Sequence, residues 1–85
     1  FRFHARDLHL VLAPQASGQP VRFRVRIDGH APGAMAGADV SAGGDGRVDE
    51  NRLYQLIRQD GEVGERSFEI EFLDPGVRAY AFTFG

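Results

Sequence analysis

Four carboxylates near the middle of the chain have the residue type and the proximity needed to bind a divalent cation. Asp39, Asp45, Asp49 and Glu50 flank the stretch GGDG, and Ca²⁺ takes about six to eight oxygen ligands. Their spacing does not match the calcium loop of an EF-hand, and Asp-Gly after Gly-Gly is also typical of a solvated hairpin turn. We therefore expect a turn here, with a metal site as the alternative, and we expect no cofactor.

Three arginines alternate along one segment and could bind an anionic ligand. Arg22, Arg24 and Arg26 share one face of VRFRVRID, where their guanidinium groups concentrate positive potential. Glu69 and Glu71 alternate in the same way later in the chain. Cross-strand pairing of these opposite charges, worth roughly 0.2–1 kcal/mol per pair, is the interpretation we prefer. With a net charge of −2 and no lysine, the chain is not expected to bind nucleic acid.

The sequence contains no recognisable catalytic motif. It has no cysteine, which excludes disulfides and thiolate chemistry from this segment. The serines lack the G-x-S-x-G pattern of a nucleophile elbow, and the histidines are too scattered for a metal triad. These residues are Ser17, Ser41 and Ser67, and His4, His9 and His30. We expect a domain that is not an enzyme.

The strongest candidate for a binding surface is the stretch RLYQLIRQDG, residues 52–61. A tyrosine combines an apolar ring with a polar hydroxyl, and sugar-binding platforms use this combination. Tyr54 would then stack on a ligand, and Arg52, Gln55 and Arg58 would add directional hydrogen bonds. An exposed Tyr54 ring would favour this ligand site, whereas a buried ring would favour a structural role.

The same stretch is ambiguous in secondary structure. Leu53, Leu56 and Ile57 have helical spacing, but a helix of about two turns is marginal in water. The surrounding strand patterns favour a strand instead. In a regular strand Leu53 and Ile57 would point to one side and Tyr54 and Leu56 to the other, so the strand would be covered on both faces or carry a surface patch.

Short alternating segments make up most of the remaining chain, and each predicts a strand with one buried face. Residues 1–12 change phase by one residue near Arg6 and Asp7, which indicates a β-bulge or a bend between two sheets. Residues 21–28 alternate without interruption. Residues 29–47 are rich in glycine and predict a long loop, with a short strand at 38–41 as an option.

The two final segments predict an antiparallel hairpin about Pro75 and Gly76, since Pro-Gly is strong turn chemistry. Residues 68–72 alternate as a strand, and the closing segment places Tyr80, Phe82 and Phe84 on one face. Several short strands separated by Gly and Pro are typical of an all-β fold. We predict an antiparallel β-sandwich of about eight short strands.

Eighty-five residues suffice for a single domain, residues 1–85. The chain begins inside a strand pattern without a start methionine, so we expect a piece of a larger protein. No apolar run approaches the roughly 20 residues of a membrane span, so no direct membrane contact is expected.

Four segments together resemble a known family: RFHARDLHLVL, VRFRVRIDG, GRVDENRLYQLIRQ and FEIEFLDPGVRAYAFTFG. They are similar to the C-terminal domain of DipZ-type proteins, which are bacterial fusions of a CcdA-like membrane unit, a thioredoxin-like domain and a carbohydrate-binding-module-like β-sandwich. The resemblance implies a non-catalytic accessory domain of jelly-roll type in a periplasmic or extracytoplasmic thiol-disulfide oxidoreductase. It implies a preceding thioredoxin-like domain as partner and carbohydrate as a ligand. The alternative is a structural or protein-interaction module that packs on that domain or mediates self-association.

Overall fold

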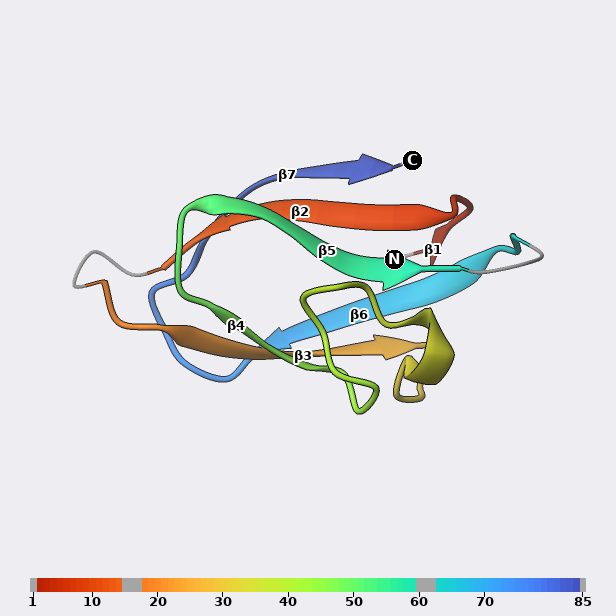
Figure 1. Cartoon of the computed structure of the whole chain (residues 1–85), viewed down its shortest axis with the longest axis horizontal. Coiled ribbons are helices and arrows are strands. Elements are labelled where there is room, and N and C mark those ends of the chain that lie inside the picture. The colour runs from red at the N-terminus through yellow and green to blue at the C-terminus, as the bar shows by residue number, and fades with distance from the viewer. Residues whose placement is uncertain (1, 15–17, 60–62, 85) are drawn as a thin grey trace.

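The described residues form seven strands in two facing antiparallel sheets (Figure 1). The computed structural model describes residues 2–14, 18–59 and 63–84, and for residues 78–84 it describes the backbone. The strands are β1 (Arg2–Phe3), β2 (Asp7–Ala13), β3 (Val21–Ile27), β4 (Asp45–Val48), β5 (Arg52–Arg58), β6 (Arg66–Phe72) and β7 (Arg78–Phe84). The expected all-β sandwich is confirmed, with seven strands in this part of the chain rather than eight.

A four-stranded sheet has the order β1-β6-β3-β4, and a three-stranded sheet has the order β5-β2-β7. Figure 1 shows β7, β2 and β5 as the upper layer and β6, β3 and β4 as the lower one. The pairs β2–β7 and β3–β6 are nested in sequence, as in the rolled hairpin of a jelly roll.

The phase shift near Arg6 and Asp7 marks the point where the chain changes sheets. β1 pairs with β6 in the four-stranded sheet, whereas β2 lies at the centre of the other sheet. Phe3 and Leu8 are buried on either side of this crossing, and His4 and Arg6 within it are exposed. The predicted bend between two sheets is therefore confirmed.

The predicted hairpin about Pro75 and Gly76 is wrong, because β6 and β7 lie in different sheets. The turn carries the chain from one sheet to the other. Asp74 anchors it by accepting hydrogen bonds from the Arg22 backbone N–H (3.0 Å), Nε (3.0 Å) and NH2 group (2.9 Å). The predicted orientation of Tyr80, Phe82 and Phe84 lies outside the described side chains.

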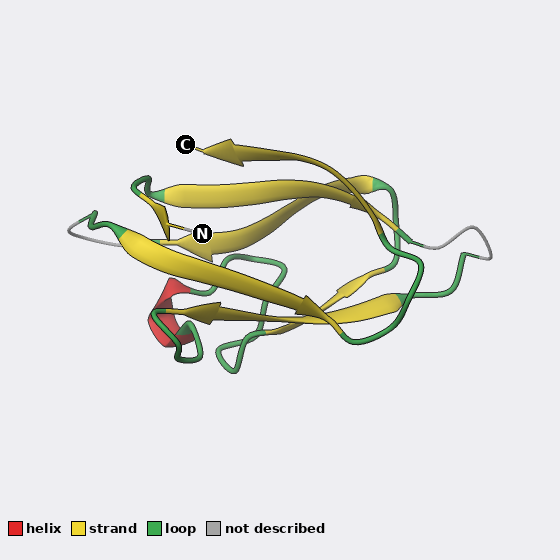
Figure 2. Cartoon of the chain, turned by 180° about the vertical axis from the view of Figure 1, so that it is seen from behind, coloured by secondary structure: helices red, strands yellow, loops and turns green. Residues whose placement is uncertain are grey.

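The glycine-rich segment contains a short 3₁₀ helix, η1 (Gly33–Met35), drawn in red in Figure 2. The optional strand at 38–41 is absent, and the segment ends earlier than expected because β4 begins at Asp45. The part of the chain that the structure describes contains no helix of the length and apolar character needed to cross a membrane.

This segment covers the free edge of β5. The backbone N–H of Gly37 donates to the carbonyl oxygen of Leu56 (3.0 Å), and that of Asp39 donates to the carbonyl oxygen of Gln55 (3.1 Å). A Cβ atom at Gly37 would overlap the backbone of Gln55 and Leu56, so only glycine allows this close approach. An uncovered edge strand is a template for unwanted pairing, and the loop removes that hazard from β5.

The core lies between the two sheets. Its largest fully buried side chains include Tyr54, Phe23, Phe68, Leu8 and Leu12. The ring of Phe68 also meets that of Phe3 edge to face, with centroids 6.3 Å apart. Phe23 and Phe68 alternate with polar neighbours in the sequence, and both point into this core.

Candidate functional site

The candidate stretch forms strand β5, and a β-bulge explains its helix-like spacing. Leu8 is paired with Ile57 but the next residue, His9, is paired with Gln55, so Leu56 is the extra residue of a bulge. Leu56 and Ile57 are both buried, whereas Leu53 is exposed. The regular alternation expected for this strand therefore holds for Tyr54 and Leu56, which are both buried, and is wrong at Ile57, because the bulge shifts the phase by one residue.

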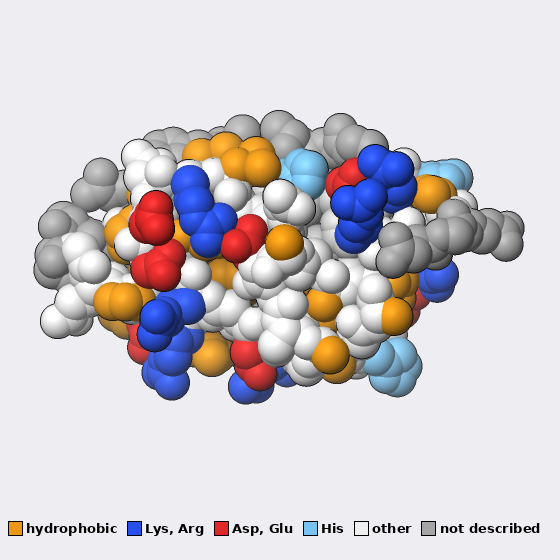
Figure 3. Space-filling view, in the orientation of Figure 1, with side chains coloured by type: hydrophobic (Ala, Val, Ile, Leu, Met, Phe, Trp, Pro, Cys, Tyr) orange, Lys and Arg blue, Asp and Glu red, His pale blue; other side chains and the backbone are white. Residues whose placement is uncertain are grey.

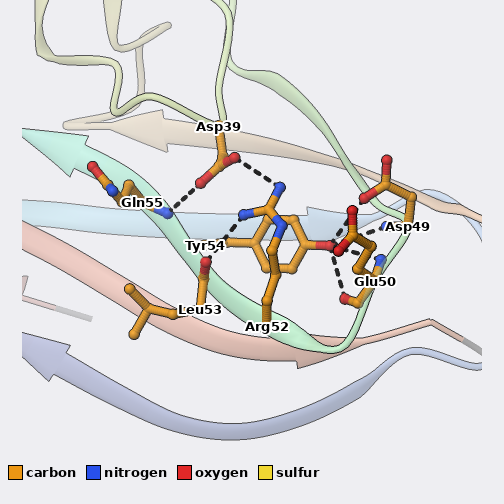
Figure 4. A network of polar contacts seen from close by, with 7 residues as sticks. All are labelled: Asp39, Asp49, Glu50, Arg52, Leu53, Tyr54 and Gln55. Atoms are coloured by element: carbon orange, nitrogen blue, oxygen red, sulfur yellow. Dashed lines mark hydrogen bonds and ion pairs between the residues drawn. The ribbon is translucent and has the colours of Figure 1, made fainter.

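Tyr54 is fully buried, with 0% of its surface exposed. Its hydroxyl accepts hydrogen bonds from the backbone N–H groups of Asp49 and Glu50 (3.0 Å each) and lies 2.9 Å from the Glu50 carbonyl oxygen, to which it donates (Figure 4). The tyrosine corner of Greek-key sandwiches ties a hydroxyl to upstream backbone in the same way. The buried ring favours the structural role and leaves no face for stacking on a sugar.

Arg52 covers the Tyr54 ring from the solvent side. Its guanidinium carbon lies 3.8 Å from the ring centroid, within the range of a cation–π contact. Its NH2 group donates to Asp39 Oδ1 at 2.9 Å, and the Gln55 backbone N–H donates to Asp39 Oδ2 at 2.7 Å. Asp39 therefore joins the loop to β5, and Figure 4 shows it on the opposite side of Arg52 from the tyrosine hydroxyl.

The Asp39 carboxylate is held in its charged form. Partial burial acts to raise its pKa, but the hydrogen bonds from Arg52 and from the Gln55 N–H outweigh burial, so the net pKa lies below its usual value. The hydrogen bond to Asp39 in turn raises the pKa of Arg52. Both groups stay ionised near neutral pH, and their pairing stabilises the folded chain.

The structure separates the other two residues of the candidate ligand site. The Gln55 side chain is exposed on the outer face of the sheet. Arg58 lies at the far end of β5, with Nε 3.9 Å from Asp7 Oδ1. Arg52 lies over the buried Tyr54 ring, whereas Gln55 and Arg58 are exposed, so the four residues do not surround one ligand position.

The four candidate metal ligands are also kept apart by other contacts. Asp39 is held by the contacts described above, Asp45 accepts from Arg24 Nε at 3.1 Å, and Asp49 and Glu50 lie in the turn between β4 and β5. Among the described residues, no three or more His, Cys, Asp or Glu side chains converge as a metal site. The described residues do not form a pocket either.

The outer face of the four-stranded sheet carries paired charges. The register places Arg24 opposite Glu71 and Arg26 opposite Glu69, and Arg22 binds the carboxylate of the turn after β6. The expected cross-strand arrangement of the arginine stripe is thus present. The stripe is balanced by acids and is not an open anion site.

The outer face of the three-stranded sheet differs in its chemistry. At its centre β2 contributes His9 and Val11, and β5 contributes Gln55 and Leu53, which are their respective register partners. Leu53 is 40% exposed, Gln55 is exposed and the other two are half-buried. We call these four residues the uncharged face. In Figure 3 hydrophobic surface and a histidine lie next to each other along the upper edge, where this sheet lies.

Gln59 is a structural residue that sequence reasoning missed. Its side chain is only 1% exposed. Its amide nitrogen donates to the carbonyl oxygens of Ala5 and Gly64 (3.0 Å each), and its Oε1 accepts from the Gly64 N–H at 3.2 Å. A polar residue just after a strand gave no signal of burial, because glutamine is usually exposed at such positions.

Comparison with known families identifies the domain. A family model described as the thioredoxin like C-terminal domain matches residues 1–85, the whole sequence. The chain belongs to this family. Searches among curated proteins and among solved structures gave no match. A thioredoxin-like C-terminal domain implies a thioredoxin-like domain before it in the parent chain, to which this sandwich is an accessory.

Proposed function

We propose that this thioredoxin-like C-terminal domain is a non-catalytic module that packs on the thioredoxin-like domain of its parent chain. The observation that carries the proposal is the internal use of the candidate ligand residues: the Tyr54 hydroxyl and the Arg52 guanidinium bind the domain's own backbone and carboxylates. These contacts hold the loops of the sandwich in place. A rigid sandwich with no recognised reactive group suits a role in support and positioning.

The resemblance to DipZ-type proteins extends this proposal to the parent. It supports a thiol-disulfide oxidoreductase outside the cytoplasm, whose redox chemistry belongs to the thioredoxin-like domain. The cysteine-free sequence of the present domain is consistent with that division of labour.

Deletion of residues 1–85 from the parent chain tests the proposal. We expect the remaining thioredoxin-like domain to reduce a small disulfide at a rate within about twofold of the full chain, which is under about 0.5 kcal/mol of barrier. We expect its melting temperature to fall, because a packed neighbour stabilises the state that it contacts. Loss of the chemical step together with an unchanged melting temperature would contradict both halves of the proposal.

Carbohydrate binding is the other function that the resemblance implies. That hypothesis relied on Tyr54 as a stacking platform, and none of the Phe and Tyr side chains described is exposed. Titration of the parent chain with a glycan panel separates the two functions. Saturable amide shifts at Arg52, Gln55 and Arg58 would support carbohydrate binding, and an unchanged spectrum at millimolar glycan would support packing alone.

A further inference from the structure

The two outer faces of the sandwich differ in charge, and this difference indicates which one meets a partner. The four-stranded sheet carries alternating Arg and Glu across β3 and β6. The uncharged face (His9, Val11, Leu53 and Gln55) has no Asp, Glu or Arg among its central described positions. Covering charged groups costs more desolvation free energy than covering apolar side chains or polar side chains that gain hydrogen bonds, so the uncharged face is the less costly one to cover.

The centre of the uncharged face is a pair of apolar side chains. Val11 and Leu53 are direct register partners on β2 and β5. Leu53 is one of two large hydrophobic residues exposed in the described part of the chain, the other being Leu73. Leu53 points away from the Tyr54 network in Figure 4, so its side chain is free of the contacts that hold the loop.

A partner cannot add a strand to the β5 edge of this sheet. Gly37 and Asp39 already occupy the hydrogen-bonding groups of Leu56 and Gln55 along the free edge of β5. A partner on this side of the molecule therefore contacts side chains on the sheet face, not the backbone of β5.

We propose that the uncharged face is the docking surface for the preceding thioredoxin-like domain, an inference that rests on the proposed function. The face spans two strands and about four residues of rise, so it measures about 10 Å by 14 Å, or about 140 Å². A stable complex between separate proteins buries about 800 Å² on each partner. This face is too small for that, but a domain on the same chain is present at a local concentration on the order of millimolar. A weak, uncharged contact is sufficient for such a tethered neighbour.

The test is to place a charge on the face in the parent chain that contains both domains. Leu53→Glu is the main variant, and Gln55→Arg is a second one that adds a charge while keeping the apolar pair. Leu73→Glu is the matched control, because Leu73 is 37% exposed, close to the 40% of Leu53, and lies in the turn after β6 rather than on this face. Amide ¹⁵N relaxation gives a separate rotational correlation time for each domain.

In the wild type we expect one common correlation time. Leu53→Glu and Gln55→Arg should each lower the ratio of docked to undocked molecules by about tenfold, the usual scale for an interface residue that matters, and shorten both correlation times. Leu73→Glu should leave the common value unchanged. Unchanged amide shifts in β2 and β5 away from the substituted residue verify that the variants are folded.

The other outcomes overturn the inference in different ways. A common correlation time that survives both face variants would assign docking to another surface and leave the proposed function standing. Independent tumbling in the wild type would refute the docking surface and the packing role together. A correlation time that rises with protein concentration, and that Leu53→Glu normalises, would make a second copy of the chain the occupant instead.

Discussion

Replacing Tyr54 with Phe removes one oxygen atom from the turn between β4 and β5 and leaves the buried ring in place. That oxygen accepts from two backbone N–H groups, of Asp49 and Glu50, at 3.0 Å each and donates to the Glu50 carbonyl at 2.9 Å. The substitution therefore tests the hydroxyl alone. A structural role for the hydroxyl predicts that the variant is less stable than the wild type, whereas a ligand role predicts unchanged stability.

The magnitude follows from the number of bonds and from their exposure. A neutral hydrogen bond contributes about 0.5–1.5 kcal/mol net, and an unsatisfied buried group costs about 1–3 kcal/mol. Asp49 and Glu50 are exposed, so water can reach the freed backbone groups in part. We expect Tyr54→Phe to lower the free energy of unfolding by about 1–3 kcal/mol. In a domain of this size that corresponds to a fall of about 5–20 °C in melting temperature.

Urea and thermal unfolding followed by circular dichroism measure this difference. Gln55→Ala is the control on the same strand: the Gln55 side chain is exposed, and we expect a change within about 0.5 kcal/mol. A Tyr54→Phe variant as stable as the wild type would refute the idea that the hydroxyl anchors the turn.

Three further substitutions test other parts of the fold. Gly37→Ala should destabilise the domain by about 1–3 kcal/mol in urea unfolding, because the new methyl group overlaps the Gln55 backbone; full stability would show that the loop does not need this approach. Gln59→Leu should lower the free energy of unfolding by about 2–4 kcal/mol in the same assay, because three backbone groups lose their hydrogen-bond partner. A loss under about 0.5 kcal/mol would mean that water replaces the amide. The hydrogen bond from Arg22 lowers the pKa of Asp74 from 3.8 to about 2. Because the folded-state pKa is lowered, the ionised Asp74 carboxyl stabilises the folded chain above about pH 4, and this stabilisation is lost as the pH falls towards 2. In the variant Arg22→Gln, NMR titration should show the carboxyl pKa returning towards 3.8. A pKa that stays low in that variant would contradict the assigned cause.

Strands with one buried and one wet face could be predicted from the sequence because alternation is a local signal. The segment 21–27 was predicted almost residue for residue and forms β3. The crossing near Arg6 was predicted as well, since a change of sheet reverses which residues point inward and leaves a visible change of phase.

Other features depend on information that no local pattern carries. Turn chemistry at Pro75 and Gly76 predicts a change of direction, but it does not determine which sheet accepts the next strand. The bulge at Leu56 is hidden because the extra residue is itself apolar. Tyr54 has the same side chain whether its hydroxyl meets water or backbone, so its burial depends on the position of the turn before it. The cover on β5 is made by backbone groups of a glycine-rich loop, which have no side-chain signature.

The nested pairing of the strands also determines when the domain can fold during synthesis. β2 is made early, yet one of its two neighbours is β7, the last strand described, and Val11 pairs with Ala81 close to the opposite end of the chain. Pairing between such distant segments is slow, because loop closure costs entropy before the contacts form. The three-stranded sheet cannot be completed until β7 has left the ribosome. A domain ahead of it in the same chain can fold first, and the sandwich then closes as a late-folding unit beside a neighbour that is already formed.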